Sequence, residues 1–377
     1  MLLGALAIAA TVVHVHGSVR AGQVQTLYTS PAHQRIQAFA QDGDLLAWFE
    51  PSTKTRACNL VWVWQLGHGK ETLPAQGPSF HNVTCLWQVP PASPVGLALA
   101  SNAGAPEVLW TLRESASRVI SFDYVLGATL ADPSERRFQQ VAHARLGAGL
   151  WLGGVAGGGT SLLYSVVDVQ YRDQVACLST PKSAHACELD VTGGGIYRIV
   201  GRKLPTAIKG AGPAVGLAVS GDDVAYLRAA PTAHPDGQPM VASDIAVEVR
   251  NVRTGALVAS IAPDTTPVAI GLSGSVLAML GSTPGGLVLS WYARDTGTPL
   301  HSMRVGKTTA PELAVGKTTI VYRNGLTIRA VDVQTHRVRT IAKAAATPIG
   351  LSIAGDRVAW AEDVGGRGRI RAVTVAP

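Results

Sequence analysis

The sequence predicts an all-β protein, a single β-propeller of seven four-stranded blades closed by strands from both ends of the chain. Three observations support this prediction. A unit of about 40 to 60 residues recurs along the chain, a period typical of stacked supersecondary units. Within each unit, apolar and polar residues alternate with the two-residue period of β-strands. The 377 residues include 41 Gly and 22 Pro, so the chain turns often.

The recurring unit is a strand of small residues, a Gly/Asp turn and a short apolar strand with a large side chain near its end. Residues 213–227 read PAVGLAVSGDDVAYL, and residues 347–361 read TPIGLSIAGDRVAWA. One large residue marks each copy of the unit, in chain order Trp48, Trp110, Tyr164, Tyr226, Met279, Tyr322 and Trp360.

Each unit continues with two more strands, as in residues 245–261 and 326–341, where a tight turn lies at or near Thr-Gly. Four strands per unit describe the blades of a propeller. The last unit lacks a fourth strand, and residues 23–28, QVQTLY, can supply it. In the second blade we expect the outer strand around Arg136 to Ala142. A short helix beginning at Asp132 is the alternative, because Asp, Pro and Glu follow there in the order of a helix start.

The chain is expected to begin with a signal peptide, residues 1–21, followed by one propeller domain, residues 22–377. The first thirteen residues, MLLGALAIAATVV, are apolar or small. They are too few to cross a hydrocarbon core of about 30 Å. No Lys or Arg precedes them, so a retained N-terminal anchor and a buried strand are the alternatives. We therefore expect an exported protein, located in the periplasm, in the cell envelope or outside the cell.

The four cysteines form two local pairs in the sequence, Cys58 with Cys85 and Cys177 with Cys187. An even number of cysteines in an exported chain favours disulfides, and we expect local pairing among the three possible connectivities. Buried free thiols are one alternative. A metal site is the other, which neither spacing favours because neither matches C-x-x-C.

The units at residues 249–273, VRNVRTGALVASIAPDTTPVAIGLS, and at residues 196–227 resemble those of TolB-like, YVTN-type and WD-repeat-like propellers of bacterial exported proteins. The resemblance covers the mature chain and rests on structural motifs. It implies a propeller fold and a role in an envelope assembly, although propellers serve unrelated tasks.

The formal net charge of +7 and the sequence pI of about 9.4 would permit an acidic partner. Lys and Arg are nevertheless scattered through the chain and are not interleaved with aromatic residues. The sequence therefore predicts no binding of nucleic acid.

The strands expected to line the central channel, such as GLAVS and GLSIAG, are small and apolar. Only Glu312 and Arg145 bring charge to them, whereas a metal ion normally needs three or four ligands. We therefore expect no metal, no cofactor and no catalytic residue. The acidic clusters at Asp42, Asp222 and Asp356 recur at the same turn, which turn chemistry explains.

Long loops between the second and third strands of several blades are the remaining candidates for function, because loops on rigid scaffolds carry recognition. They predict a mildly basic binding surface formed by Arg56, Arg172, Lys182, Arg228 and Arg367. We expect a monomeric, non-catalytic scaffold that binds a protein, an envelope component or a ligand, with peripheral membrane association as a further possibility. A propeller enzyme of the lactonase or hydrolase type is the alternative.

Overall fold

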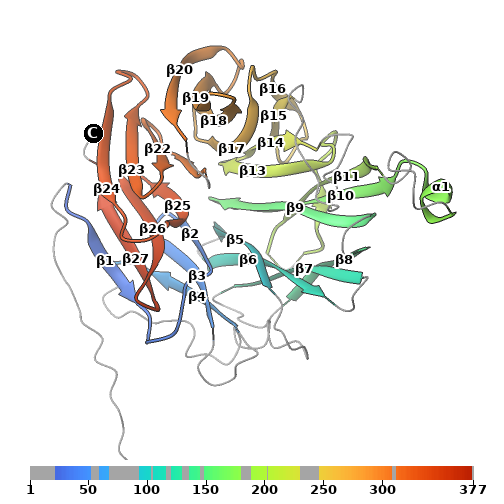
Figure 1. Ribbon diagram of the computed structural model, residues 1–377, viewed down its shortest axis with the longest axis horizontal. Coiled ribbons are helices and arrows are strands. Elements are labelled where there is room, and N and C mark those ends of the chain that lie inside the picture. The colour runs from blue at the N-terminus through green and yellow to red at the C-terminus, as the bar shows by residue number, and fades with distance from the viewer. Residues whose placement is uncertain are drawn as a thin grey trace, which may run out of the picture.

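The β-sheets are arranged radially around a central axis, as the computed structural model shows (Figure 1). The structure describes residues 22–51, 59–67, 93–102, 105–115, 120–129, 136–144, 148–179, 188–201, 203–229, 246–307 and 311–375. The prediction of an all-β propeller is confirmed. Within the described residues, no helix has the length and apolar character that a bilayer span requires.

The inner strands form a closed ring in which each one contacts the next and the last contacts the first. They are β2 (Ala38–Asp42), β5 (Ser93–Asn102), β9 (Gly149–Gly158), β13 (Ala214–Ser220), β17 (Thr266–Leu272), β21 (Leu313–Val315) and β25 (Ile349–Ala354). Each inner strand turns back into a second strand, and the two pair in antiparallel fashion. All other strands therefore lie further from the axis.

The first two sheets are the irregular ones. The first has three strands, β2, β3 (Leu45–Pro51) and β4 (Asn59–Gln65). The second has eight strands in the order β12 to β5. Besides β5 and β9 it contains β6 (Ala105–Ser115), β7 (Ile120–Thr129), β8 (Arg136–Ala144), β10 (Ser161–Tyr171), β11 (Leu189–Ile199) and β12 (Thr206–Ala207). Helix α1 (Gln174–Ser179) lies between β10 and β11.

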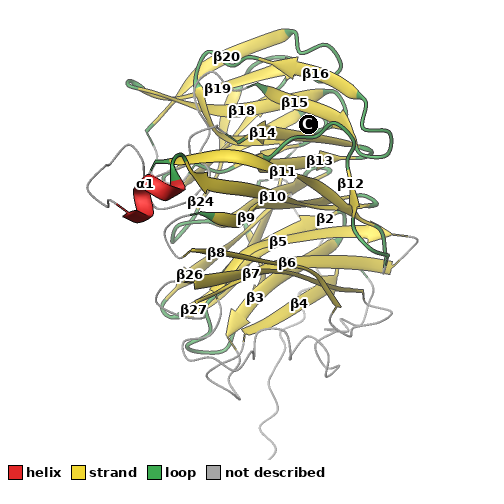
Figure 2. Ribbon diagram, turned by 90° about the vertical axis from the view of Figure 1, so that its right-hand side faces the viewer, coloured by secondary structure: helices red, strands yellow, loops and turns green. Residues whose placement is uncertain are grey.

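The remaining sheets have four strands each. One contains β13, β14 (Asp223–Arg228), β15 (Val247–Asn251) and β16 (Leu257–Ile261). The next contains β17, β18 (Val276–Thr283), β19 (Gly286–Ala293) and β20 (Pro299–Gly306). The third contains β21, β22 (Thr319–Asn324), β23 (Thr327–Asp332) and β24 (Val338–Lys343). The fourth contains β25, β26 (Arg357–Val364), β27 (Arg367–Thr374) and β1 (Gln25–Thr29). Figure 2 shows the strands from the side.

The prediction of seven separate four-stranded blades is wrong. Among the described residues, five sheets have four strands or more and a sixth has three. The eight-stranded sheet arises because β8 pairs with β9 through His143 and Gly149. A Cβ atom at Gly149 would lie 2.5 Å from the His143 Cα, so only glycine permits this approach.

A buried polar cluster fastens β6, β7 and β8 to β9. The Asp123 carboxylate accepts hydrogen bonds from Arg113 Nε at 2.7 Å and from the Leu152 N–H at 3.3 Å. The His143 ring stacks on Trp151 with a centroid distance of 3.5 Å. The Arg113 guanidinium also lies over the Trp151 ring, 4.9 Å from its centroid. Burial raises the pKa of Asp123, but hydrogen bonds from His143 and Arg113 outweigh it and leave the pKa below its usual value.

Closure of the ring by both ends of the described chain is confirmed. β1 pairs in antiparallel register with β27, with Gln25 opposite Ala372 and Thr29 opposite Arg369. The segment after β1 adds to the contact, because Gly368 N–H donates to Ser30 Oγ at 2.8 Å. The pairing satisfies backbone groups of β27 that would otherwise form an exposed sheet edge.

The core lies between neighbouring sheets. The large residues that mark the repeat all lie on second strands and are at most 1% exposed; they are Trp48, Trp110, Tyr164, Tyr226, Met279, Tyr322 and Trp360. The prediction of a strand around Arg136 to Ala142 is also confirmed, because β8 spans Arg136–Ala144. Residues 132–135, the alternative helix start, lie outside the described residues.

Candidate functional site

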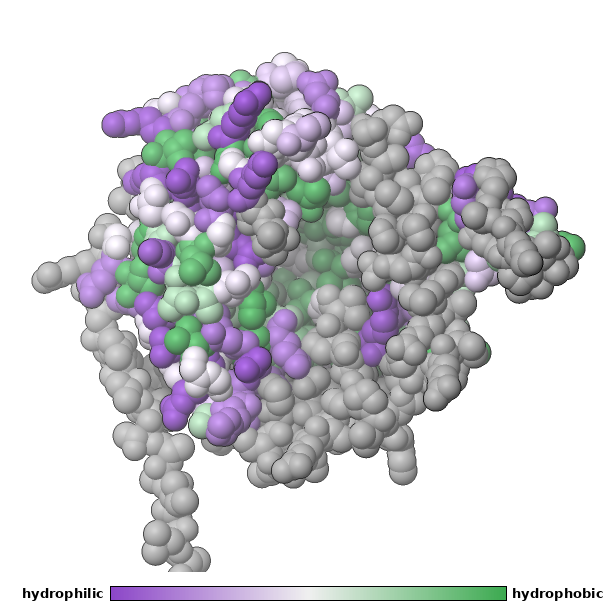
Figure 3. Space-filling view, viewed as in Figure 1, coloured by the Kyte–Doolittle hydropathy of each residue, from purple (hydrophilic) through white to green (hydrophobic). Residues whose placement is uncertain are grey.

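A cavity of about 540 Å³ opens at one end of the central channel. It is formed by the turns that join inner strands to second strands, so turns from different sheets converge on it. We call this cavity the channel-mouth pocket. Its lining is Asp42, Gly158, Gly159, Val219, Ser220, Gly221, Leu272, Ser273, Gly274, Ser275, Val315, Gly316, Lys317 and Ile353. The ring is also hollowed at its centre on the face that Figure 3 shows, where hydrophobic residues line the hollow.

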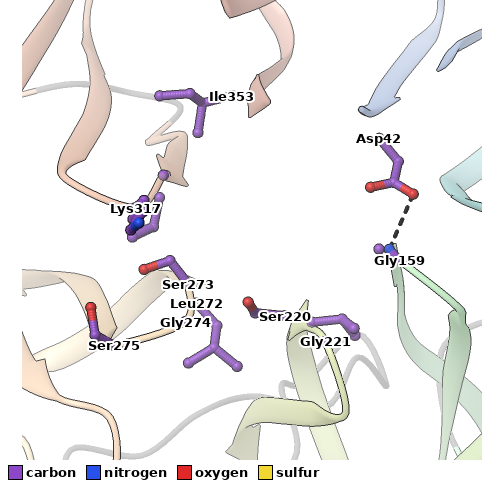
Figure 4. A pocket seen from close by; sticks show the side chains of 14 residues that line it. Asp42, Gly159, Ser220, Gly221, Leu272, Ser273, Gly274, Ser275, Lys317 and Ile353 are labelled. Carbon is purple, nitrogen blue, oxygen red and sulfur yellow. Dashed lines mark hydrogen bonds between the residues drawn. The ribbon is translucent and has the colours of Figure 1, made fainter. Parts of the chain in front are cut away.

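The two charged groups of the pocket lie on opposite walls (Figure 4). Asp42, at the end of β2, accepts a hydrogen bond from the Gly159 N–H at 3.1 Å, which fixes its carboxylate against the neighbouring turn. Lys317 lies in the turn between β21 and β22 and is exposed. A ligand in the pocket would therefore meet a negative group at one end and a positive group at the other.

Hydroxyl groups lie between the two charges. Ser220 is the last residue of the inner strand β13, and Ser273 and Ser275 lie in the turn after β17. Ser273 is 6% exposed, and its Oγ makes no hydrogen bond among the described residues. A buried hydroxyl without a partner costs about 1–3 kcal/mol, so this side chain would gain from a polar partner in the pocket.

The acidic turns follow the predicted turn chemistry. Gly43, Gly221 and Gly355 have φ values of 55°, 60° and 61°, the left-handed conformation that glycine adopts without strain. The neighbouring carboxylates make ion pairs, as between Asp44 and Arg357 at 3.0 Å. From the sequence, Asp42 was assigned to this turn, and Lys317 and Ser220 were not identified as candidates. Ser273 and Ser275 lie in the string Gly271–Ser275, which resembles a G-x-S-x-G nucleophile motif but lacks its final glycine. For Lys317 and Ser220 the only signal was a polar residue beside a recurring turn glycine.

Glu312, the predicted charge on the channel strands, connects two sheets. Its Oε2 accepts a hydrogen bond from the Leu351 N–H of β25 at 3.0 Å. Burial raises the pKa of Glu312. Asp363 makes a similar contact, because its Oδ1 accepts from the Ile36 N–H at 3.0 Å. Arg145, the other predicted charge, lies outside the described residues.

The predicted basic loop surface is only partly described. Arg56 and Lys182 lie outside the described residues. Arg172 bonds to Asp190 through Nη2 at 2.9 Å and also pairs with Glu188, so it clamps the base of its own loop. Arg228 is 3.6 Å from Glu248, with a side chain that is 53% exposed, and Arg367 is exposed. Of the three described residues, Arg228 and Arg367 therefore offer the more available charges.

The loop that Arg172 clamps carries a projecting arm. β10 and β11 have 11 residues each, and α1 extends beyond their ends, away from the ring (Figures 1 and 2). Val175, on α1, is 79% exposed. Cys177, also on α1, is disulfide-bonded. Cys58, Cys85 and Cys187 lie outside the described residues, so the two predicted pairings stay predictions.

The described part of the chain contains no group of three or more His, Cys, Asp or Glu side chains placed to hold one ion.

The fold and the channel-mouth pocket define a β-propeller protein. No protein-family model matches the sequence, and no curated protein matches it. Similar folds occur among solved structures. A puromycin-hydrolyzing peptidase of Mycobacterium tuberculosis shares 14% identity at a TM-score of 0.51, over 96% of this chain and 57% of that chain. The β-propeller domain of the Trilobed protease from Pyrococcus furiosus shares 10% identity at a TM-score of 0.50, over 90% and 95% of the two chains.

These similarities show the fold alone. A puromycin hydrolase structure complexed with PGG matches at 13% identity and a TM-score of 0.51, over 87% of this chain and 50% of that chain. This chain therefore spans only about half the length of the puromycin hydrolase and of the puromycin-hydrolyzing peptidase. The Pyrococcus domain is described as having an open velcro topology, whereas β1 and β27 pair here. The more specific TolB-like and YVTN-type resemblance stays a prediction.

Proposed function

We propose that this protein is a non-catalytic, extracytoplasmic β-propeller that binds a small acidic ligand in the channel-mouth pocket. The observation behind the proposal is the placement of Lys317 and Asp42 on opposite walls of a cavity of about 540 Å³. Cavities of roughly 300–1,000 Å³ with a few convergent polar groups are typical of small-molecule sites.

The lining favours a ligand that carries a carboxylate and hydroxyl groups. The Lys317 ammonium attracts the carboxylate, and Ser220 and Ser275 offer hydroxyls that both donate and accept hydrogen bonds. Asp42 would accept from a donor at the far end of the ligand. Leu272 and Val315 provide apolar contacts between these polar groups. A sugar acid has this combination of groups, whereas a neutral sugar lacks the partner for Lys317.

Titration with D-glucuronate and D-glucose, followed by calorimetry and by ligand-observed NMR, tests the proposal. We expect glucuronate to bind and glucose to bind more weakly. Lys317→Met should weaken glucuronate binding by about tenfold or more, because it removes the charge and keeps the length of the side chain. Lys343→Met is the matched control, since Lys343 is an exposed lysine at the end of β24. Equal binding by Lys317→Met and the unmodified protein would contradict the proposal.

A second surface, for a macromolecular partner, is proposed on the opposite face of the ring. Successive strands are antiparallel, so the loops that join second to third strands open away from the channel-mouth pocket. The arm formed by β10, α1 and β11 projects there and presents Val175. An apolar side chain on a clamped arm suits contact with a protein or an envelope component, which the predicted export would bring within reach.

The test compares two variants in capture from a membrane-envelope fraction. Arg228→Gln with Arg367→Gln removes the two available charges, and Val175→Asp changes the arm. We expect both variants to lose a partner that the unmodified protein captures, while thermal melts stay within a few degrees. Retention of every captured protein by both variants would remove the loop face from the proposal. Hydrolysis of a lactone by the unmodified protein, abolished by Glu312→Gln, would favour the enzyme alternative.

A further inference from the structure

His336 occupies a backbone position that glycine fills in two equivalent turns. The turns between third and fourth strands have the same form in the three sheets that begin with β13, β17 and β21. In the first two, Gly255 and Gly297 have φ values of 74° and 70°. In the third, His336 has a φ value of 59°. This left-handed region disfavours any residue with a Cβ, although histidine enters it more often than most.

The backbone hydrogen bonds show that the three turns are the same. In each, the N–H at this position donates to the carbonyl oxygen four residues earlier. The bonds are Gly255 N–H to Asn251 O at 2.8 Å, Gly297 N–H to Ala293 O at 2.8 Å and His336 N–H to Asp332 O at 2.9 Å. Glycine would therefore fit at residue 336 with less strain. The reason for histidine must lie in its side chain.

The side chain of His336 lies against a second histidine from the neighbouring sheet. The His301 and His336 rings stack with a centroid distance of 3.9 Å and an interplanar angle of 21°. His301 lies on β20 and His336 follows β23, so the pair bridges two sheets. Both rings contact Trp291, with centroid distances of 4.8 and 5.5 Å, and Trp291 is fully buried. Both imidazoles therefore pack at an angle against one buried ring.

We propose that His301 and His336 form a binding site for a divalent transition-metal ion of the Cu²⁺, Ni²⁺ and Zn²⁺ group. Neutral imidazole is a preferred ligand of these ions. His336 is exposed and His301 is half-buried, so an ion can reach the pair from solvent. The site is separate from the channel-mouth pocket and does not depend on the function proposed for that pocket.

Binding of one ion by both rings requires a change in the stack. Imidazole lone pairs lie in the ring plane, so two nearly parallel rings with centroids 3.9 Å apart cannot both direct a lone pair at the same ion. The exposed His336 ring would turn out of the stack, so that one nitrogen of each ring lies about 2.0–2.1 Å from the ion. Water fills the other coordination positions, which makes this an open two-histidine site. The order of affinities for such nitrogen ligands places Cu²⁺ above Ni²⁺ and Zn²⁺.

The experiment measures Ni²⁺ binding by the untagged full chain, by calorimetry and by the shift of the thermal midpoint, with Mg²⁺ as the negative control ion. His336→Gly removes the ligand, and the equivalent turns show that its backbone accepts glycine. His301→Phe keeps an aromatic ring in the stack without a nitrogen. His33→Gly is the matched control, because His33 is the other non-glycine residue with positive φ in the described chain, at 66°.

We expect the unmodified protein and His33→Gly to bind Ni²⁺ with the same affinity and to show the same rise in the thermal midpoint. His336→Gly and His301→Phe should each bind Ni²⁺ at least about tenfold more weakly. Mutation of a residue that only supports a metal ligand already lowers metal affinity by about tenfold or more, so loss of the ligand itself should cost at least as much. Unchanged Ni²⁺ affinity in His336→Gly would overturn the proposal. The absence of any His336-dependent binding would also overturn it. A His336→Gly variant that is less stable without metal but keeps its affinity for Ni²⁺ would overturn it as well and would assign His336 to packing.

Discussion

The substitution Glu50→Gln tests how the ring is closed. Tyr28, on the closing strand β1, donates its hydroxyl hydrogen to the Glu50 carboxylate of β3, with Oε2 at 3.0 Å. Trp48 Nε1 also donates to Oε2, at 3.2 Å. Glu50 is 1% exposed. Burial raises its pKa from the ordinary 4.5 to about 6, against the lowering effect of these hydrogen bonds.

A raised pKa means that the folded protein holds the proton of Glu50 more tightly than the unfolded chain does. The contribution to stability is therefore complete below about pH 4.5 and is lost as the pH rises through about 6. At about 1.36 kcal/mol per pKa unit, the shift from 4.5 to about 6 corresponds to about 2 kcal/mol. Above pH 6 the folded state carries a buried charge at that cost.

Glutamine keeps the size of the side chain and one carbonyl acceptor but never ionises. Glu50→Gln should therefore be more stable than the unmodified protein at pH 7.5, by up to about 2 kcal/mol, and of similar stability at pH 4.5. Urea unfolding at both pH values measures the difference. Tyr28→Phe is the companion variant and should lose more stability at pH 7.5 than at pH 4.5, because hydrogen bonds to charged groups are worth about 1.5–3 kcal/mol. A Glu50→Gln difference that is independent of pH, or negative at pH 7.5, would refute this reasoning.

Three further substitutions test other contacts. Gly368→Ala should cost about 1–3 kcal/mol by urea unfolding, because its Cβ would lie 2.7 Å from the Ile36 N. Gly212→Ala, which meets open space, should change stability by less than about 0.5 kcal/mol, and equal effects would count against tight packing at the ring closure. Asp123→Asn should lower the free energy of unfolding by roughly 3 kcal/mol at pH 7. This loss should shrink as the pH falls below 3.8, the ordinary pKa of an aspartate, because the lowered pKa of Asp123 makes its contribution to stability vanish in acid. A loss of stability that is the same at every pH would contradict this prediction. Arg172→Ala should leave the melt within a few degrees but speed protease cleavage of the arm, because the clamp on Glu188 is lost, and an unchanged cleavage rate would show that the clamp is unimportant.

Part of the fold was predictable because it repeats. Each copy places a large residue such as Trp48 or Tyr226 at the same point of a second strand, and burial of these residues between sheets follows from that period. Ring closure was predictable because a strand was missing at one end of the chain and spare at the other. The prediction of a β8 strand was correct for the same reason, since the repeat requires a strand there.

The merging of two sheets was not predictable from the repeat. It depends on one contact between His143 and Gly149, residues that follow one another across a short connection and match no other copy. The pocket was missed for a different reason. Lys317 and Ser273 acquire a common environment only when turns from different sheets meet at the axis. A residue beside a turn glycine has no sequence signal for this convergence.

The pairing of β1 with β27 also has a consequence for biosynthesis. Ser30 and Gly368, which bond across this closure, are 338 residues apart. The ribosome makes β1 early and β27 only after every other described strand, so β1 must wait for its partner throughout translation. Contacts over such separations form slowly, because a long chain must first close into a loop. A nascent chain of this protein therefore remains an open array of sheets until β27 emerges, and the ring can close only after synthesis of the described strands is complete.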